Sequence, residues 1–251
     1  MPESSLILSR DDLYAEWGHR LGYGRTVEAW NTDQLEDVRA VARTALRKVY
    51  FCGHSWSYLR PLGTVTTVSG VADYDLSDDF GGMTDPWLTF AEGIGYGRIP
   101  VVMENVIRDR RAATTSTGIP TRAAIRPKRN TGTAGTRWEL LLWPEPSGAW
   151  DLSFRYELMP GALTDERPYP VGSAHLSELF RLSGHAVIEK EYDHEEGPMV
   201  RDFENELARA IQRDASLHSP KTLGCMGPAQ GLSHEDYYRS NTALVTYGGF
   251  G

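Results

Sequence analysis

The chain has only two cysteines among its 251 residues, Cys52 and Cys225. Cysteines this few and this far apart exclude the dense disulfide framework of a small secreted domain, and they fit reduced thiols in a cytosolic protein at least as well as one disulfide. Zinc binding is not expected either, because Cys52-x-His54 has no second pair of ligands at zinc spacing.

Long hydrophobic runs are also missing. The longest apolar runs, such as Leu140–Trp143, are far too short to span a membrane. The N-terminal stretch MPESSLILSRDD has no basic region ahead of an apolar one, so no signal peptide is expected. A net charge of −8 is moderate and argues against a nucleic-acid coat, while 40% apolar residues suffice for the core of one large domain or two small ones.

The sequence contains no convincing catalytic or nucleotide-binding motif. Gly53–Ser57 is one residue short of the G-x-S-x-G elbow, and it follows a helical pattern and precedes strands, which inverts the context that the elbow needs. We therefore expect Ser55 and Ser57 to act in a turn or a cap rather than as nucleophiles. Gly93–Gly97 fails the spacing of a dinucleotide fingerprint, and no Walker pattern occurs. We predict neither a catalytic residue nor a cofactor.

Two Glu-x-x-His pairs leave one enzymatic alternative open. Glu16–His19 and Glu191–His194 share the spacing that carboxylate-bridged di-metal sites use on one helix face. Gly18 interrupts the first pair and the second lies at a polar helix end, so no metal site is predicted. A di-metal site would also need carboxylates from two other helices, for which the formal candidates are Glu36 and either Glu204 or Glu206.

Four segments carry the 3.6-residue apolar period of an amphipathic helix. Ser9 and Asp12 have the capping-box spacing, and Asn31, with a glutamine three residues on, heads the best helical pattern in the sequence. Ser173 is expected to cap a third helix, and Pro198 suits the first turn of a fourth. The predicted helices are Ser9–Leu21, Asn31–Tyr50, Ser173–Tyr192 and Pro198–Ala215.

From Gly63 the period of the sequence changes to two, with β-branched residues that favour strands. Gly70 can turn the chain, so Ala72–Leu76 is expected to pair back on the strand before it. Clusters of glycine, proline, threonine and serine separate the later candidates at the spacing of a small antiparallel sandwich or barrel. Those candidates are Trp87–Ala91, Ile99–Ile107, Arg122–Pro127, Arg137–Trp143 and Trp150–Leu158.

The order of elements is helix, helix, β region, helix, helix and tail, which predicts an α+β fold. Because no apolar helix stripe can stay in water, the simplest packing is one four-helix bundle built from both ends of the chain. We assign the bundle to residues 1–50 and 172–215, an inserted antiparallel β domain to residues 51–171, and an extended C-terminal tail to residues 216–251.

The middle of the chain is strongly basic. Arg108–Arg137 holds eight cations against Asp109 alone, a charge of +7, which leaves −15 for the rest of the chain. Such a segment is either a solvated loop face or a patch that meets an acidic neighbour, a second copy of this chain or DNA. The candidate contact residues are Arg108, Arg110, Arg111, Arg122, Arg126, Lys128 and Arg129.

Two stretches of the sequence resemble a known family. WSYLRP at Trp56–Pro61, followed by an alternating run and the acidic turn of Tyr74–Met83, is similar to the head-to-tail adaptors of tailed bacteriophages. FRYELMP at Phe154–Pro160, followed by Tyr169–Gly172 and a helix, is similar to a later part of the same group, which includes podophage tail accessory factors and siphophage head-completion proteins. The order of elements agrees with that group over most of the chain.

The resemblance implies a structural virion protein and not an enzyme. It implies a ring, with twelve copies expected, that joins the portal to the tail, continues the DNA channel, and lies in the virion neck after assembly in the host cytoplasm. The β insertion would face outward or towards the next tail or nozzle protein. The C-terminal extension would bind the portal through Tyr237, Tyr238, Arg239, Asn241, Leu244, Val245 and Tyr247.

Two other classes of function stay open. One is a host- or glycan-binding β module carried on a helical stem, which an isolated segment 63–160 that folds alone and binds glycan would favour. The other is a metal-dependent enzyme that uses the Glu-x-x-His pairs, which metal analysis of the purified protein would decide.

Overall fold

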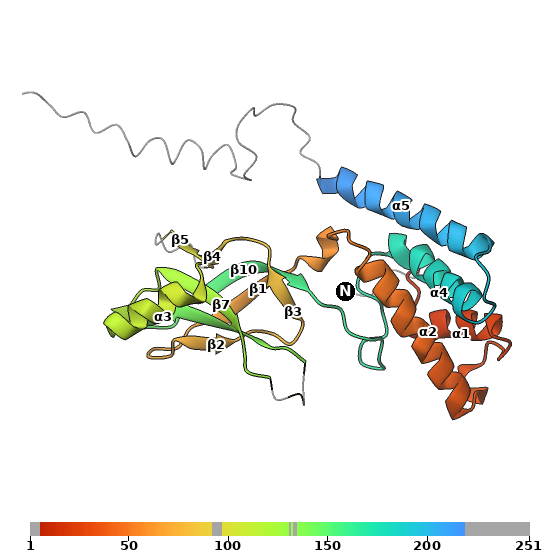
Figure 1. Cartoon of the computed structure of the whole chain (residues 1–251), viewed down its shortest axis with the longest axis horizontal. Coiled ribbons are helices and arrows are strands. Elements are labelled where there is room, and N and C mark those ends of the chain that lie inside the picture. Colours follow the sequence, from red (N-terminus) through yellow and green to blue (C-terminus); the bar gives the residue numbers. More distant parts are fainter. Residues whose placement is uncertain (1–5, 92–96, 131, 133–134, 219–251) are drawn as a thin grey trace, which may run out of the picture. The chain divides into compact units, whose positions relative to one another are not determined.

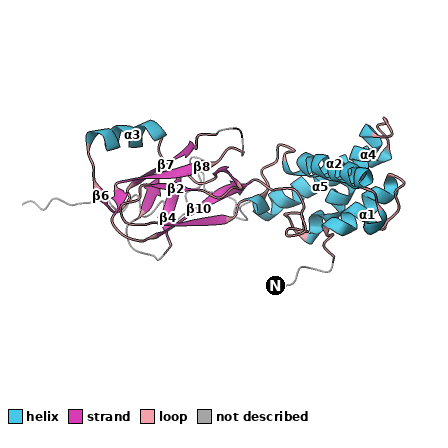
Figure 2. Ribbon diagram, turned by 90° about the horizontal axis from the view of Figure 1, so that it is seen from below, coloured by secondary structure: helices cyan, strands magenta, loops and turns pink. Residues whose placement is uncertain are grey.

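The computed structural model describes residues 6–91, 97–130, 132 and 135–218. The fold is α+β, as the order of elements predicted, and its helices and antiparallel sheets are drawn in Figures 1 and 2. None of the helices in these ranges combines the length and the hydrophobicity that crossing a bilayer requires.

Local capping sets where the first two long helices begin. Four of the helices are α1 (Arg10–Arg20), α2 (Thr32–Tyr50), α4 (Ser177–Glu191) and α5 (Pro198–His218). Before α1, Ser9 accepts a hydrogen bond from the backbone N–H of Asp12, whose side chain accepts one from the backbone N–H of Ser9. Asn31 and Gln34 form the same capping box before α2, so both predicted caps are present.

Helices from both ends of the chain share one hydrophobic core. Helices α1, α2 and α4 pack against one another, while α5 adds Phe203 and Ala210 to the same cluster. Trp17 of α1 is fully buried, and its indole N–H donates to the carbonyl oxygen of Arg181 on α4 at 3.0 Å. The backbone of α5 makes fewer close approaches than the other three, so a regular four-helix bundle stays a prediction.

Between α2 and α4 lie two antiparallel sheets and one short parallel pair. The strands are β1 (Leu62–Thr66), β2 (Asp73–Asp75), β3 (Phe80–Met83), β4 (Trp87–Phe90), β5 (Arg98–Pro100), β6 (Thr117–Gly118), β7 (Arg122–Pro127), β8 (Trp138–Trp143), β9 (Glu145–Pro146) and β10 (Asp151–Leu158). The larger sheet has the order β1-β10-β4-β5, with β3 also paired to β10, and the smaller has the order β2-β8-β7. The pair β6 and β9 is parallel. Leu88, Leu142 and Leu152 are fully buried in a second hydrophobic core.

Two predictions within the β region are wrong. Gly70 does turn the chain, in the left-handed conformation at φ +80°, but Ala72–Leu76 does not pair back, because β1 pairs with β10 and β2 with β8. Ile99–Ile107 is not one strand, because β5 ends at Pro100 and α3 (Glu104–Ala113) follows. A helix forms here because it buries Ile107 completely against the smaller sheet while Arg108 and Arg110 stay exposed.

The start of α4 also differs from the prediction. Ser173 makes no side-chain cap; a 3-10 turn at Ala174–Leu176 follows it, and α4 begins without a capping hydrogen bond. The helical core includes Trp56 and Leu59, which follow the predicted limit at residue 50. The proposed domain limits themselves stay a prediction.

Candidate assembly surfaces

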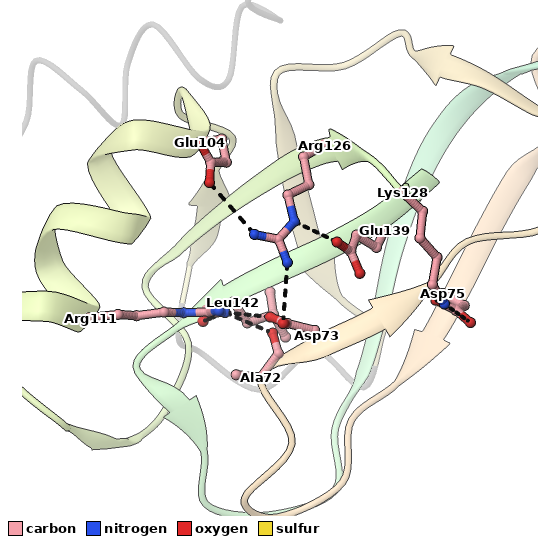
Figure 3. A network of polar contacts seen from close by, with 9 residues as sticks. All are labelled: Ala72, Asp73, Asp75, Glu104, Arg111, Arg126, Lys128, Glu139 and Leu142. Atoms are coloured by element: carbon pink, nitrogen blue, oxygen red, sulfur yellow. Dashed lines mark hydrogen bonds and ion pairs between the residues drawn. The ribbon is translucent and has the colours of Figure 1, made fainter. Parts of the chain in front are cut away.

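The basic segment folds into a network with acidic residues from elsewhere in the chain, shown in Figure 3. Arg126, on β7, lies among three carboxylates. Its Nε donates to Glu139 Oε1 at 2.5 Å, and its Nη atoms lie 3.7 Å from Asp73 Oδ2 and 3.6 Å from Glu104 Oε1. The hydrogen bond with Glu139 raises the pKa of the Arg126 guanidinium, although burial acts against it. One side chain of β7 thereby joins β2, α3 and β8.

Arg111 ties α3 to the smaller sheet. Its Nη2 donates to the carbonyl oxygens of Ala72 and Leu142, each at 3.1 Å, and lies 2.7 Å from Asp73 Oδ1 (Figure 3). Nη2 carries two N–H groups, so the two carbonyls and the carboxylate share its donors and leave none for another partner. Arg111 is therefore a structural residue and not a free surface cation.

Two further cations of the segment also meet carboxylates. Lys128 Nζ lies 2.6 Å from Asp75 Oδ1, and Arg108 Nη1 lies 3.6 Å from Glu104 Oε2. Much of the positive charge seen in the sequence is thus offset within the β region. Four of the seven candidate contact residues therefore meet carboxylates of their own chain, and the contact role of the segment stays a prediction.

The three remaining members of the predicted contact set do not pair with carboxylates among the described residues. The guanidinium of Arg110 lies over the Trp143 ring, 4.7 Å from its centroid. Within the residues that the structure describes, Arg110, Arg122 and Arg129 enter no ion pair. These three side chains keep their charge available for a partner, and their contact role stays a prediction.

The predicted portal-binding residues, from Tyr237 to Tyr247, lie outside the described residues. Both Glu-x-x-His pairs lie within the described residues. In the first pair, Glu16 Oε1 lies 2.6 Å from Arg25 Nη1. In the second, His194 follows α4 in the left-handed conformation at φ 57°. In the described ranges, no group of three or more His, Cys, Asp or Glu side chains is placed to hold a metal ion.

A His-Ser-Asp cluster joins α5 to the segment between α2 and β1. Asp214 Oδ2 lies 2.8 Å from His54 Nε2, and Asp214 Oδ1 accepts from Ser57 Oγ at 2.5 Å. The serine hydroxyl donates to the aspartate and not to the histidine, so this is not the relay of a hydrolase triad. Burial by itself raises the pKa of Asp214, but the hydrogen bonds from Ser57 and His54 outweigh burial and hold that pKa below its usual value.

Sequence reasoning gave Ser57 a turn or capping role and missed Asp214. No local signal could have found it, because the two residues lie 157 positions apart in the chain. The cluster fixes the C-terminal half of α5 beside the entry to the β region. These hydrogen bonds give the cluster a structural role, which is to hold α5 to the segment between α2 and β1.

A polar groove of about 610 Å³ lies between α1, α4 and α5. Its wall includes His185, which is only 7% exposed. Burial, and then the nearby Arg181 guanidinium, lower the pKa of His185. The imidazole lies 3.3 Å from Arg181 Nη1, as an acceptor for that cation when neutral.

Comparison with known families identifies the chain. A family model described as SU10 adaptor protein matches residues 18–223, which is most of the sequence. The chain therefore belongs to this family of phage adaptors, and the resemblance to the head-to-tail adaptors of tailed bacteriophages is confirmed. No match was found among curated proteins. The chain is a structural phage adaptor, of the kind that contacts other head or tail proteins.

Proposed function

We propose that this adaptor forms a ring that links the portal of a tailed bacteriophage to its tail and continues the DNA channel. The observation that carries the proposal is the family match over residues 18–223. The fold supports it, because one hydrophobic core of helices and one of strands give the chain separate bodies for different neighbours.

A ring requires each copy to present two different faces that fit each other. Such a heterologous contact closes when the rotation between neighbours divides a full turn. We expect twelve copies. In this proposal the wall of the lumen is acidic, so that it offers few cations to replace the counterions of DNA and lets the duplex slide; the net charge of −8 is consistent with such a wall.

In this proposal the C-terminal residues Tyr237–Tyr247 bind the portal, and the β region faces the next tail or nozzle protein. Tyrosine suits such a segment because it is enriched in the buried centre of interfaces. Arg110, Arg122 and Arg129 remain the candidates for subunit or partner contacts, since no described carboxylate pairs with them. Arg111 and Arg126 are left out because they hold the β region together.

Binding to purified portal by the full chain and by a chain ending at Ser233 tests the proposal. The full chain is expected to bind, and the truncated chain to lose at least about tenfold in affinity, since it lacks the proposed interface centre. Circular dichroism of both chains controls for folding. If the full chain did not bind the portal, the proposal would be wrong. No described residues are grouped to hold a metal ion, so nothing in that part of the chain favours the metal-dependent alternative.

A further inference from the structure

One face of α2 borders an exposed groove that contains arginines with little or no pairing. This arginine groove has a volume of about 520 Å³ and is lined by Arg43, Arg47 and Phe51, opposite Pro160–Ala162. Arg47 enters no ion pair among the described residues, and Arg43 Nη2 lies 3.9 Å from Glu36 Oε2. Phe51 is 58% exposed. The groove therefore fits a partner that brings carboxylates together with an apolar or aromatic side chain.

The connection between α4 and α5 has the opposite character. This acidic loop, Glu191–Glu196, carries four carboxylates and is exposed along its whole length. Two of them pair with cations of their own chain, but Glu191 and Glu195 enter no ion pair in the described part of the chain. Tyr192, between them, is 41% exposed. The loop offers the carboxylates that the arginine groove lacks, and an exposed aromatic ring that can pack beside Phe51.

Contacts with α4 hold the acidic loop in one shape. The backbone N–H of Glu195 donates to the Glu189 carbonyl oxygen at 3.1 Å, and the buried Glu189 carboxylate accepts from Val200 N at 3.0 Å. A Cβ on Gly197 would lie 2.4 Å from Glu189 Oε1, so a larger residue there would displace the Glu189 carboxylate. A loop fixed in this way loses little conformational entropy when it binds.

The groove and the loop lie at opposite ends of the α2–α4 pair. Tyr50, at the groove end of α2, packs on Phe180 near the start of α4, with ring centroids 5.6 Å apart. The loop follows the other end of α4, where Asp193 lies 3.5 Å from Arg20. Arg47 lies 15 residues after Thr32, the first residue of α2, which is about 22 Å along the helix at 1.5 Å per residue. No residue of the acidic loop lines the groove of its own chain.

We infer that the acidic loop of one copy binds in the arginine groove of the next copy. The inference rests on the proposed function, since a ring needs one face of each copy to fit a different face of its neighbour. Glu191 and Glu195 pair with Arg43 and Arg47 across the contact, and Tyr192 packs on Phe51. A second copy is the occupant because the charges are complementary and the acidic loop of the same chain does not line the groove.

Charge reversal on either side tests this contact. Arg43→Glu with Arg47→Glu makes the groove repel the loop, and Glu191→Arg with Glu195→Arg makes the loop repel the groove. Each double variant is expected to weaken assembly of this chain, alone or on the portal, by at least about tenfold. The double variant Arg155→Glu with Arg201→Glu changes the net charge as the groove variant does, at exposed arginines outside the contact, and is expected to assemble normally.

Mixing the two defective variants gives the decisive result. Each has a groove and a loop of the same sign and repels itself, but the groove of either fits the loop of the other. An equimolar mixture is therefore expected to recover assembly, with the two variants alternating. Circular dichroism and the unfolding midpoint confirm that each variant folds.

The outcomes separate this inference from the proposed function. Wild-type chain that assembles neither alone nor on the portal rejects the ring itself. Wild-type chain that assembles while both reversals assemble equally well overturns the contact and leaves the ring standing. A groove reversal that weakens assembly without rescue by the loop reversal assigns the groove to another acidic partner and also overturns the inference.

Discussion

At the scale of single residues, two glycines decide how closely aromatic rings approach the helices. A Cβ added to Gly184 of α4 would lie 2.1 Å from the Trp17 indole, and one added to Gly18 of α1 would lie 2.2 Å from the Trp30 ring. Real side chains do not come so close, so both sites require glycine. Gly18, which interrupts a Glu-x-x-His pair in the sequence, is explained by packing.

Gly184→Ala is expected to lower the free energy of unfolding by about 1–3 kcal/mol, because the added methyl group overpacks the contact between α1 and α4. Chemical denaturation followed by circular dichroism measures the change. Gly135→Ala is the control, since no atom of the described residues lies within 4 Å of the added Cβ there. Equal stability of the two variants would show that Trp17 moves aside without cost.

His185 gives the helical core a dependence on pH. Burial and the Arg181 guanidinium lower its pKa in the folded state, so the unfolded chain binds the proton more tightly. Its contribution to stability is full above the unfolded pKa of about 6.5. That contribution is lost as the pH falls below this value towards the folded pKa.

Measuring the free energy of unfolding at pH 8 and pH 5 tests this assignment. The wild-type chain is expected to lose more stability over this range than His185→Gln, which cannot take up the proton at that site. All other histidines are shared by the two proteins, so the difference belongs to His185. An identical loss of unfolding free energy in both proteins would show that His185 does not cause the pH dependence.

At the scale of elements, the Arg126 network joins α3 to the smaller sheet. Arg126→Ala leaves Glu139, Asp73 and Glu104 facing one another without their shared cation. We expect a loss of about 1–2 kcal/mol in unfolding free energy, because Glu139 is left without its charged hydrogen-bond partner. The partly exposed guanidinium keeps the effect at this modest size.

Arg129→Ala serves as the control for Arg126→Ala, because Arg129 is exposed and enters no ion pair among the described residues. Unfolding by urea at low and at high salt measures both variants. The difference between them is expected to shrink at high salt, where exposed charges are screened. Equal stability of the two variants at low salt would mean that the network contributes nothing measurable.

The elements that the sequence predicted well are those set by neighbours in the chain. The capping pairs of α1 and α2 lie three residues apart, and both are present. The partner of β1 could not be read in this way, because Leu62 pairs with Arg155. Strand pairing over such separations depends on the whole fold, and no local period reports it.

The same limit explains why the sequence alone did not show that the basic segment pairs with carboxylates of its own chain. The arginines and the lysine of the basic segment were visible as a run, but their carboxylates come from β2, α3 and β8. In the sequence, only the two acidic residues of Asp73–Asp75, which alternate along a short strand, indicated a charged partner for the basic segment. A charge count along the sequence therefore overstates the charge that the folded surface presents.

At the scale of the whole molecule, assembly depends on faces rather than on net charge. Much of the basic segment meets carboxylates of its own chain, so fewer of its cations remain for a partner than the sequence suggested. Arg43 and Arg47 of α2 are better placed, because they border a groove with little charge of the opposite sign. Our inference therefore places the proposed contact between copies in the helical part of the chain.

In the proposed function, the adaptor joins the portal as a closed ring. Light scattering on a sizing column gives the mass of the portal with and without saturating adaptor. We predict one discrete complex whose added mass is a fixed whole number of 28.0 kDa chains, with twelve expected. A portal whose mass does not change, or one that gains a variable and concentration-dependent amount, would contradict the account.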